Sequence, residues 1–348
     1  MTGGDQGSDH DVRIGVVGAG SWGTAIANLL ADKGCPLDLW AYEQEVVDQI
    51  TEAGENRVFL PGVNLSENLR PTTDLARVAR DKDMLVVVCP SHVLRETATR
   101  MAPEIDPDTI LVSATKGIET GTHKLMTEVL DEVVEQVPED RICAISGPSF
   151  AREVAMGMPT LVTVAGRNEE VAKAVQYAFA TPVFRVYMNP DMVGVQLAGA
   201  VKNVHAIASG ISEGLGMGTN TRAALITRGL AEINRLGAAM GADPRTFMGL
   251  AGVGDLVLTC TAELSRNYSL GKKMGQGHKL EDILAGMRMV AEGVQTARSL
   301  YNLTRKINVE MPIAEMCYRV LFEDMAPGLA LMALMTRALK DELRDTPV

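Results

Sequence analysis

The stretch 12-VRIGVVGAGSWGTAIANLLADKG-34 decides the fold of the N-terminal half. It opens with a short apolar run, 12-VRIGVV-17, which is typical of a buried β-strand, and it closes with a helical pattern, 24-TAIANLLADKG-34. Between them, 18-GAGSWG-23 matches the spacing G-x-G-x-x-G. The strand, the turn and the helix follow one another at the spacing of a dinucleotide-binding βα unit.

Each glycine of this turn has a separate physical role. Gly18 permits the tight turn, Gly20 lets a pyrophosphate approach the backbone, and Gly23 lets the helix pack close to the sheet. The first amides of the helix then hold the phosphate charge. We expect dinucleotide binding here; the alternative is an ordinary glycine-rich βα turn.

Further apolar runs alternate with helical patterns as far as about residue 186. Most are rich in Val, Ile and Leu and are bounded by Gly, Pro, Asp or Ser, as expected for strands buried on both faces of a largely parallel sheet. They are 37-LDLWA-41, 84-MLVVVC-89, 110-ILVSA-114, 142-ICAI-145, 160-TLVTVA-165 and 183-VFRVY-187. This alternation predicts a doubly wound α/β domain.

After 188-MNPD-191 the strand signals stop and helical patterns follow, with Thr221 and Ser265 near helix starts and Gly241 after an end. The expected helices are 191–213, 221–240, 253–261, 265–275, 291–307, 312–323 and 328–344. The sequence therefore predicts a disordered tail at 1–10, an α/β domain at 11–190 and an all-α domain at 191–348.

Composition excludes several classes of protein. The net charge of −11 argues against a nonspecific nucleic-acid binder, which would need a basic face. The five cysteines never form a C-x-x-C pair, so they are expected to be reduced thiols in the core, with no disulfide or zinc framework. The polar, acidic start lacks the features of a signal peptide, and no apolar run is long enough to span a membrane. We expect a cytoplasmic protein that needs no metal.

The acidic residue expected about 20 positions after the glycine turn is Glu43, in 39-LWAYEQ-44. A carboxylate there would bind the ribose hydroxyls of NAD and repel the extra phosphate of NADP. The alternative is that Glu43 only starts the helix 43-EQEVVDQI-50. The sequence favours NAD and leaves NADP open.

Polar residues occur at four places that regular structure does not require. Lys116, in 114-ATKG-117, follows a predicted strand, as does Ser149 in 146-SGPSFA-151, and ligands bind at such carboxyl ends. Asp255 follows two glycines, and 265-SRN-267 sits at a predicted helix start, where it could hold a phosphate. Taken singly, each has a plain alternative: a solvated lysine, a helix cap or half of a surface ion pair.

Lys202 stands in 194-GVQLAGAVKNVHAIASG-210, where its neighbours at helical spacing are small or apolar. Burial would lower the pKa of this lysine, so that it could give and take protons. The alternative is a lysine whose ammonium group reaches out to water between small residues. The sequence alone leaves both open.

Together these segments resemble the bacterial NAD(P)-dependent glycerol-3-phosphate dehydrogenases over nearly the whole chain. The resemblance is carried by 18-GAGSWGTA-25, 58-VFLPGV-63, 113-SATKGIE-119, 146-SGPSFAREV-154, 199-GAVKN-203, 222-RAALITRGLAE-232, 247-FMGLAGVGDLVLTCT-261 and 265-SRN-267. It implies a Rossmann-like domain followed by an all-helical domain. It also implies NAD or NADP as a dissociable coenzyme, and a role in supplying glycerol 3-phosphate for glycerophospholipid synthesis.

The resemblance assigns roles to residues at matching positions. Lys202 would be the proton acceptor. Substrate contacts would come from Lys116, Gly147, Ser149, Lys202, Asp255, Ser265, Arg266 and Asn267. Coenzyme contacts would come from Gly18, Gly20, Ser21, Trp22, Gly23, Tyr42, Lys116, Ala151, Arg266, Val290 and Glu292. Relatives often carry His or Arg at the position of Tyr42.

The implied reaction interconverts sn-glycerol 3-phosphate and dihydroxyacetone phosphate in the cleft between the two domains. Lys116 would lower the pKa of Lys202 and Asp255 would raise it, and the sequence does not decide which prevails. A dehydrogenase acting on a 3-hydroxyacid or on 6-phosphogluconate is a second possibility, and a nucleotide sensor without catalysis is a third. The sequence leaves the oligomeric state open and favours a homodimer, the commonest assembly; 328-GLALMALMT-336 is either core or interface.

Overall fold

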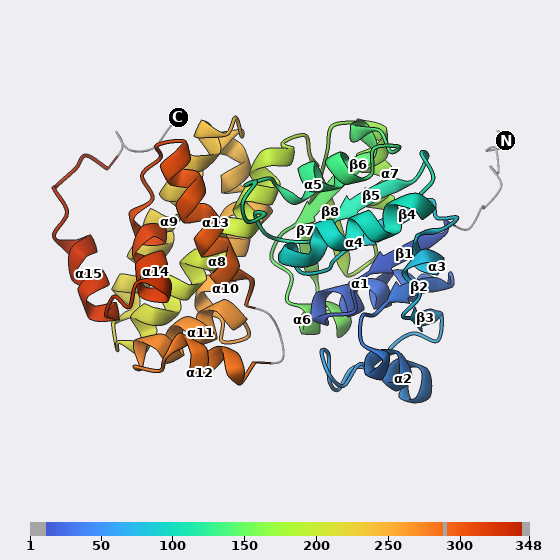
Figure 1. Cartoon of the computed structure of the whole chain (residues 1–348), viewed down its shortest axis with the longest axis horizontal. Helices are drawn as coiled ribbons and strands as arrows, with labels where there is room; N and C mark the ends of the chain where they lie inside the picture. Colours follow the sequence, from blue (N-terminus) through green and yellow to red (C-terminus); the bar gives the residue numbers. More distant parts are fainter. Residues whose placement is uncertain (1–11, 288–290, 343–348) are drawn as a thin grey trace.

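The structure is a computed structural model that describes residues 12–287 and 291–342. The predicted tail at 1–10 lies outside the described residues. Two bodies lie side by side, a sheet flanked by helices and a cluster of helices (Figure 1). This arrangement confirms the predicted fold class, a Rossmann-like domain followed by an all-α domain.

The sheet has eight strands in the order β3-β2-β1-β4-β5-β6-β7-β8. Every neighbouring pair is parallel except β6 and β7. The strands are β1 (Ile14–Val17), β2 (Leu37–Trp40), β3 (Leu69–Thr72), β4 (Met84–Val87), β5 (Ile110–Ser113), β6 (Ile142–Ser146), β7 (Thr160–Gly166) and β8 (Phe184–Asn189). The chain order reverses on either side of β1 and β4, and this point opens the crevice in which such sheets bind ligands.

Helices cover both faces of the sheet, which explains why its strands are apolar throughout. One apolar core joins the sheet to α1 (Ser21–Ala31), α2 (Gln44–Ala53), α6 (Ala151–Ala155) and α7 (Glu169–Phe179). The core on the opposite face joins it to α3 (Leu75–Ala79), α4 (Leu94–Met101) and α5 (Met126–Val133).

The helical domain is built around α8 (Met192–Gly214), whose side chains are buried on nearly every side. Because the helix is apolar or small all round, it is stable only when other helices surround it. Those helices are α9 (Thr219–Ala239), α10 (Asp255–Thr261), α11 (Arg266–Gly275), α12 (Leu280–Ala285), α13 (Glu292–Lys306), α14 (Pro312–Phe322) and α15 (Pro327–Met335). A small cluster that includes Ala144, Val195 and Ala251 packs α8 against the sheet, so the two domains share an apolar contact.

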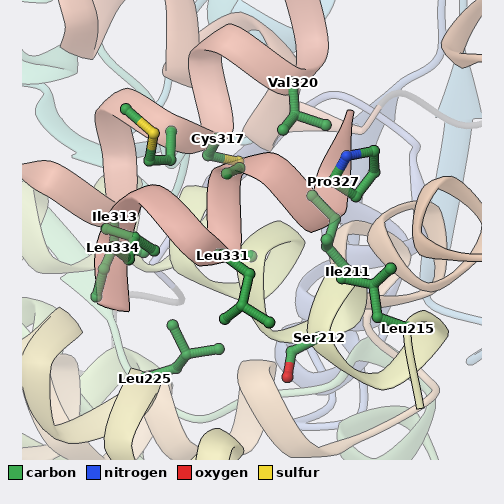
Figure 2. Close-up of a pocket in the computed structure, with 13 residues that line it drawn as sticks. Ile211, Ser212, Leu215, Leu225, Ile313, Cys317, Val320, Pro327, Leu331 and Leu334 are labelled. Carbon is green, nitrogen blue, oxygen red and sulfur yellow. The ribbon is translucent and has the colours of Figure 1, made fainter. Parts of the chain in front are cut away.

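An apolar cavity of about 40 Å³ lies beneath α15, between it and α8, α9 and α14 (Figure 2). Aliphatic side chains such as Ile211, Leu225 and Leu331 line it. Ser212 also lines it, and its buried hydroxyl has no hydrogen-bond partner among the described residues. The cavity is therefore a place where the helical core is incompletely packed.

Three predictions of local structure were wrong. The strand β3 was missed, because 69-LRPT-72 carries a proline and a charge and forms only as the edge partner of β2. The short helix α12 was also missed. The last helix, predicted at 328–344, ends at Met335.

The predicted helix starts and ends at Ser265, Gly241 and Thr221 agree with the structure to within a few residues. Ser265 caps α11 by accepting a hydrogen bond from the backbone N–H of Tyr268, and Gly241 follows α9 with a positive φ of 81°. Thr221 lies in the first turn of α9, which Gly218 precedes. None of the described helices combines the length and apolar character that crossing a bilayer requires.

Candidate active site

A cleft of about 660 Å³ lies where the carboxyl ends of the central strands meet the helical domain. The sheet domain contributes the glycine turn, the ends of β2, β4 and β5, and the start of α6, while the helical domain contributes α8, α10, α11 and α13. The cleft is thus large enough for a dinucleotide-sized ligand and draws its walls from both domains.

The glycine turn has the geometry that its sequence predicts. Gly18 has a φ of 118°, and a Cβ there would lie 2.9 Å from the backbone of Cys89. A Cβ on Gly23 would lie 1.8 Å from the carbonyl oxygen of Gly18, whereas one on Gly20 would meet no atom within 4 Å. Gly18 and Gly23 are required by close packing, and Gly20 leaves the start of α1 open towards the cleft.

The two residues after Gly20 also line the cleft. Ser21 donates a hydrogen bond to the carbonyl oxygen of Phe59 at 2.6 Å. The indole N–H of Trp22 is buried and has no hydrogen-bond partner among the described residues. The start of α1 carries no side-chain cap, so its first amide N–H groups can donate hydrogen bonds to an anionic ligand.

Tyr42 and Glu43 line the cleft at the end of β2. Tyr42 is 76% exposed and meets Trp40 edge to face. Glu43 directly precedes α2, and its side chain makes no capping hydrogen bond. The alternative that Glu43 starts this helix is confirmed, since it occupies the N-cap position, and its exposed side chain also lines the cleft.

Lys116 follows β5 and points across the sheet edge. Its Nζ donates to the carbonyl oxygen of Gly147 at 3.2 Å and to Oδ2 of Asp255 at 2.9 Å. Gly147 has a φ of 144°, which favours glycine, and its carbonyl oxygen also accepts a hydrogen bond from Oγ of Ser149 at 3.0 Å. Lys116 is therefore fixed by both domains and is not the solvated lysine of the alternative interpretation.

Lys202 lies in the middle of α8 and is 6% exposed. One turn earlier, a Cβ on Gly199 would lie 2.5 Å from Oγ of Ser146 and 3.6 Å from the side chain of Lys116. The missing side chain at this position lets the stem of Lys116 pass close to α8. The alternative in which Lys202 reaches out to bulk water is wrong, because its Nζ donates to Asp255 and to Thr259 inside the protein.

Asp255 is the first residue of α10 and is 1% exposed. A π-helical turn, η5 (Leu250–Gly254), leads into it. A Cβ on Gly252 would lie 2.1 Å from the carbonyl oxygen of Phe247, so this turn needs a glycine. The two carboxylate oxygens of Asp255 accept from different lysines, Oδ1 from Lys202 and Oδ2 from Lys116.

Burial lowers the pKa of Lys202 to about 7. The negative charge of Asp255 raises this pKa and the positive charge of Lys116 lowers it, but burial is the largest influence. Between the two charges, that of Asp255 has the larger effect, so the shift of the Lys202 pKa comes mainly from burial. An amine with a pKa near 7 can exchange a proton near neutral pH.

Ser265, Arg266 and Asn267 line the cleft at the start of α11. Burial lowers the pKa of Arg266, and the carboxylate of Glu292 opposes that shift. The side chain of Asn267 donates to Oδ1 of Asn203 at 3.0 Å and accepts from the N–H of Gly293 at 3.0 Å. Asn267 thus ties together three helices, α8, α11 and α13.

The remaining predicted residues fall into three groups. Ala151 and Glu292 line the cleft from the starts of α6 and α13. Gly147 and Asp255 are not among the described lining residues but are hydrogen-bonded to those that are. Val290 lies outside the described residues. The sheet order separates Tyr42 from Lys116, since β1 and β4 stand between β2 and β5.

Two contacts of Lys202 and Asn267 were missed by the sequence interpretation. Oγ1 of Thr259 accepts a hydrogen bond from Nζ of Lys202 at 2.9 Å and donates to the carbonyl oxygen of Asp255 at 2.6 Å. Its position four residues after Asp255 on one helix was the available signal. Asn203, which follows Lys202 directly, supplies the acceptor for Asn267.

Comparison with known proteins identifies the family. The model for the N-terminus of NAD-dependent glycerol-3-phosphate dehydrogenase matches residues 13–172, and the model for its C-terminus matches residues 191–332. The chain belongs to the NAD-dependent glycerol-3-phosphate dehydrogenase family.

Individual members of the glycerol-3-phosphate dehydrogenase family are similar to this protein over almost the whole chain. A relative from Geobacter sulfurreducens, named glycerol-3-phosphate dehydrogenase (NAD(P)+), is 56% identical over 332 residues, which cover 95% of this chain and 98% of the relative. One from Syntrophobacter fumaroxidans with the same name is 54% identical over 330 residues, 95% of this chain and 97% of the relative. The crystal structure of glycerol-3-phosphate dehydrogenase from Coxiella burnetii superposes with a TM-score of 0.90 at 41% identity, covering 94% of this chain and 99% of that one.

The described residues contain no group of three or more His, Cys, Asp or Glu side chains that could hold a metal ion. The charged side chains that line the cleft are those of two lysines, three arginines and three glutamates: Lys116, Lys202, Arg100, Arg152, Arg266, Glu43, Glu96 and Glu292.

Proposed function

We propose that this protein interconverts sn-glycerol 3-phosphate and dihydroxyacetone phosphate, with NAD or NADP as the dissociable hydride carrier and Lys202 as the proton carrier. The observation that supports this best is the cluster of Lys116, Asp255 and Lys202, in which a buried amine with a pKa of about 7 lies on the wall of a dinucleotide-sized cleft. A protein that only sensed nucleotides would have no need of such an amine.

In the oxidising direction, neutral Lys202 takes the proton of the secondary hydroxyl as the hydride leaves the same carbon. In the reducing direction its ammonium form returns a proton to the developing alkoxide. Its Nζ already donates to Asp255 and Thr259, which fix its direction inside the cleft. The nicotinamide ring supplies the other half of the chemistry, since it accepts or gives the hydride.

Lys116 polarises the same substrate oxygen and stabilises its negative charge as the proton moves. Its links to Gly147 and Asp255 hold the ammonium group in place before substrate arrives. Ser149 supports that arrangement through its hydrogen bond to Gly147 and offers its hydroxyl to the substrate. Asp255 holds both amines through its two carboxylate oxygens, and its negative charge raises the pKa of Lys202 against the effect of burial.

The start of α11 binds the substrate phosphate. Arg266 supplies a guanidinium group, and the first amides of a helix attract an anion. The side chain of Asn267 is already engaged with Asn203 and Gly293, so its contribution is to fix the helix start and to offer its backbone N–H. Phosphate binding away from the reacting carbon orients the substrate for hydride transfer.

The coenzyme pyrophosphate binds over Gly18, Gly20 and Gly23, close to Ser21 and Trp22. The open space at Gly20 and the uncapped start of α1 fit an anionic ligand. Further contacts come from Tyr42, Lys116, Ala151, Arg266, Val290 and Glu292. We keep both NAD and NADP, because Glu43 favours NAD while Arg100 also lines the cleft.

We place the boundary between the coenzyme domain and the substrate domain at about residue 190, between the end of β8 at Asn189 and the start of α8 at Met192. We further propose a cytoplasmic enzyme that supplies glycerol 3-phosphate for glycerophospholipid synthesis and forms a homodimer. Support for the dimer comes from α15, where Leu329, Met332 and Met335 are exposed apolar side chains.

One assay tests the proposed reaction. Purified protein is mixed with dihydroxyacetone phosphate and either NADH or NADPH, and nicotinamide absorbance is followed. Loss of absorbance that requires the phosphorylated ketone supports the proposal. Oxidation of the coenzyme only with a different carbonyl compound would reassign the substrate, and no oxidation with either coenzyme would favour a sensor.

A further inference from the structure

A second contact between the domains lies directly behind the cleft wall. Ser91 belongs to a short 3₁₀ turn, η1 (Ser91–Val93), after β4, and Glu292 is the first residue of α13, 201 positions away. Oγ of Ser91 donates to Oε2 of Glu292 at 2.7 Å, and its backbone N–H donates to Oε1 at 3.4 Å. One serine therefore engages both oxygens of one carboxylate.

The surroundings leave this serine little freedom. Ser91 is 5% exposed, and a Cβ on Gly117 would lie 2.4 Å from the Cβ of Ser91 and 3.9 Å from Oε2 of Glu292. Gly117 directly follows Lys116. The contact therefore joins the turn after β4, against which the loop of Lys116 packs, to the start of a helix in the other domain.

Glu292 lines the cleft, whereas Ser91 does not appear among the described residues that line it. Because both oxygens of the Glu292 carboxylate accept hydrogen bonds from Ser91, its orientation on the cleft wall is restricted. Ser91 thus acts on a ligand only through Glu292, which makes it a candidate positioning residue.

Burial raises the pKa of Glu292, and the two hydrogen bonds from Ser91 oppose that rise. Electrostatic interactions with His92, next to Ser91 on η1, and with Arg266 on α11 oppose it as well. The thiol of Cys89, just after β4, also interacts with Glu292, and burial raises the pKa of that thiol to about 12. Without the Ser91 hydroxyl, the pKa of Glu292 would rise further.

From this geometry we propose that Ser91 positions the carboxylate of Glu292, in its charged form, to bind the coenzyme on the cleft wall. The inference builds on the proposed function, in which Glu292 contacts the coenzyme. It adds a residue that no part of the sequence motif suggested.

The experiment measures NADH binding by fluorescence titration, so that it does not depend on turnover. Ser91→Ala is expected to raise the dissociation constant roughly tenfold at pH 7, since a hydrogen bond to a charged group is lost. The loss of affinity towards acid pH is expected to begin at higher pH than in the parent protein. At saturating NADH, kcat is expected to change less than about twofold.

The chain offers a matched control. Oγ1 of Thr120 and Oγ of Ser299 form another hydroxyl contact between the domains, at 3.1 Å, and neither residue is among those described as lining the cleft. Thr120→Val should leave NADH affinity and its pH dependence unchanged. If Ser91→Ala matched Thr120→Val in both measurements, Ser91 would be a structural contact only and the inference would be overturned.

A double-mutant cycle separates the effect of Ser91 on Glu292 from any general destabilisation of the protein by the substitution. In a Glu292→Gln background, Ser91→Ala should have much less effect on NADH affinity than in the parent, because the charged partner is gone. Equal effects in both backgrounds would overturn the inference. If Ser91→Ala does not fold, Ser91→Cys, with a weaker donor of similar size, is expected to fall between the parent and the tenfold loss, and a parent-like affinity would contradict the proposal.

The experiments distinguish a wrong assignment of Ser91 from a wrong assignment of the reaction. A parent protein that binds NADH but does not reduce dihydroxyacetone phosphate would refute the proposed reaction, while the Ser91 measurements would still stand. An active parent enzyme whose NADH affinity ignores Ser91 would refute only the positioning role.

Discussion

Lys202 and Asp255 stand 53 residues apart on different helices, and the lysine Nζ donates to Oδ1 of the aspartate inside the protein. The other carboxylate oxygen of Asp255 accepts from Lys116 in the opposite domain at 2.9 Å. One buried carboxylate therefore links the two amines of the cleft.

Lys202→Ala is expected to reduce turnover on the order of 10²-fold or more, because the proton carrier is lost. The variant should still fold and bind NADH, since the coenzyme turn is in the other domain. Initial rates and NADH titration measure the two effects separately. Lys173→Ala, an exposed lysine on α7, serves as control, and near-normal turnover of Lys202→Ala would reject the catalytic role.

The pH dependence should follow the pKa of Lys202, which burial lowers to about 7. Oxidation of glycerol 3-phosphate needs the neutral amine, so its kcat/KM should rise with pH through about 7. Reduction of dihydroxyacetone phosphate needs the ammonium form and should fall over the same range. Bound phosphate adds negative charge, which should move the inflection in kcat to higher pH.

The residual activity of Lys202→Ala is the control for this profile. It keeps the ionisation of the substrate phosphate, whose second pKa is near 6, and lacks that of the amine. An inflection near pH 7 that survives in the variant would show that another group controls the rate.

Arg266→Ala is expected to raise KM for dihydroxyacetone phosphate on the order of tenfold or more, with a smaller loss of coenzyme affinity, because a charge-assisted contact to phosphate is removed. Activity with unphosphorylated dihydroxyacetone should change much less. Arg245→Ala removes a highly exposed arginine and should have no effect. If substrate saturation were unchanged in Arg266→Ala, the phosphate assignment would be wrong.

A side chain at Gly20 should affect coenzyme binding, whereas one at Gly23 should affect the stability of the fold. Gly20→Val is expected to keep the melting temperature, since a Cβ there meets no atom within 4 Å, but to weaken NADH binding strongly by filling the pyrophosphate path. Gly23→Ala should destabilise the fold, because its Cβ would lie 1.8 Å from the oxygen of Gly18. Thermal unfolding and NADH titration distinguish the two. Normal NADH affinity in Gly20→Val would contradict the proposed coenzyme position.

Ser212→Ala should stabilise the helical domain. The hydroxyl lies on the apolar cavity of Figure 2 with no hydrogen-bond partner among the described residues, so its removal is expected to raise the free energy of unfolding by about 1 kcal/mol. Ser209→Ala on the same helix should lower it by a similar amount, because that hydroxyl donates to the carbonyl oxygen of Cys260 at 2.8 Å. Chemical denaturation measures both, and a destabilised Ser212→Ala would mean that the hydroxyl has a partner in solution.

Features that depend on neighbouring residues were predictable from the sequence. The turn at 18-GAGSWG-23, the cap at Ser265 and the seven predicted strands all occur, because backbone conformation, capping and side-chain periodicity act over a few residues. The edge strand β3 could not be predicted from its own residues, because it forms only by hydrogen bonding to β2. The last helix was predicted too long; the chain leaves it after Met335, and Arg337 and Lys340 both reach Glu310.

The sequence by itself determined which chemical groups the site contains and the order in which they occur. Only the tertiary structure decided that Lys202 is buried, that Asp255 lies between two amines, and that Ser91 holds Glu292. Burial and charge act through space over a few ångströms, and residues far apart in the chain become neighbours only when it folds. Lys116 and Gly147, 31 positions apart, meet within the sheet domain, whereas Ser91 and Glu292, 201 positions apart, meet between the two domains.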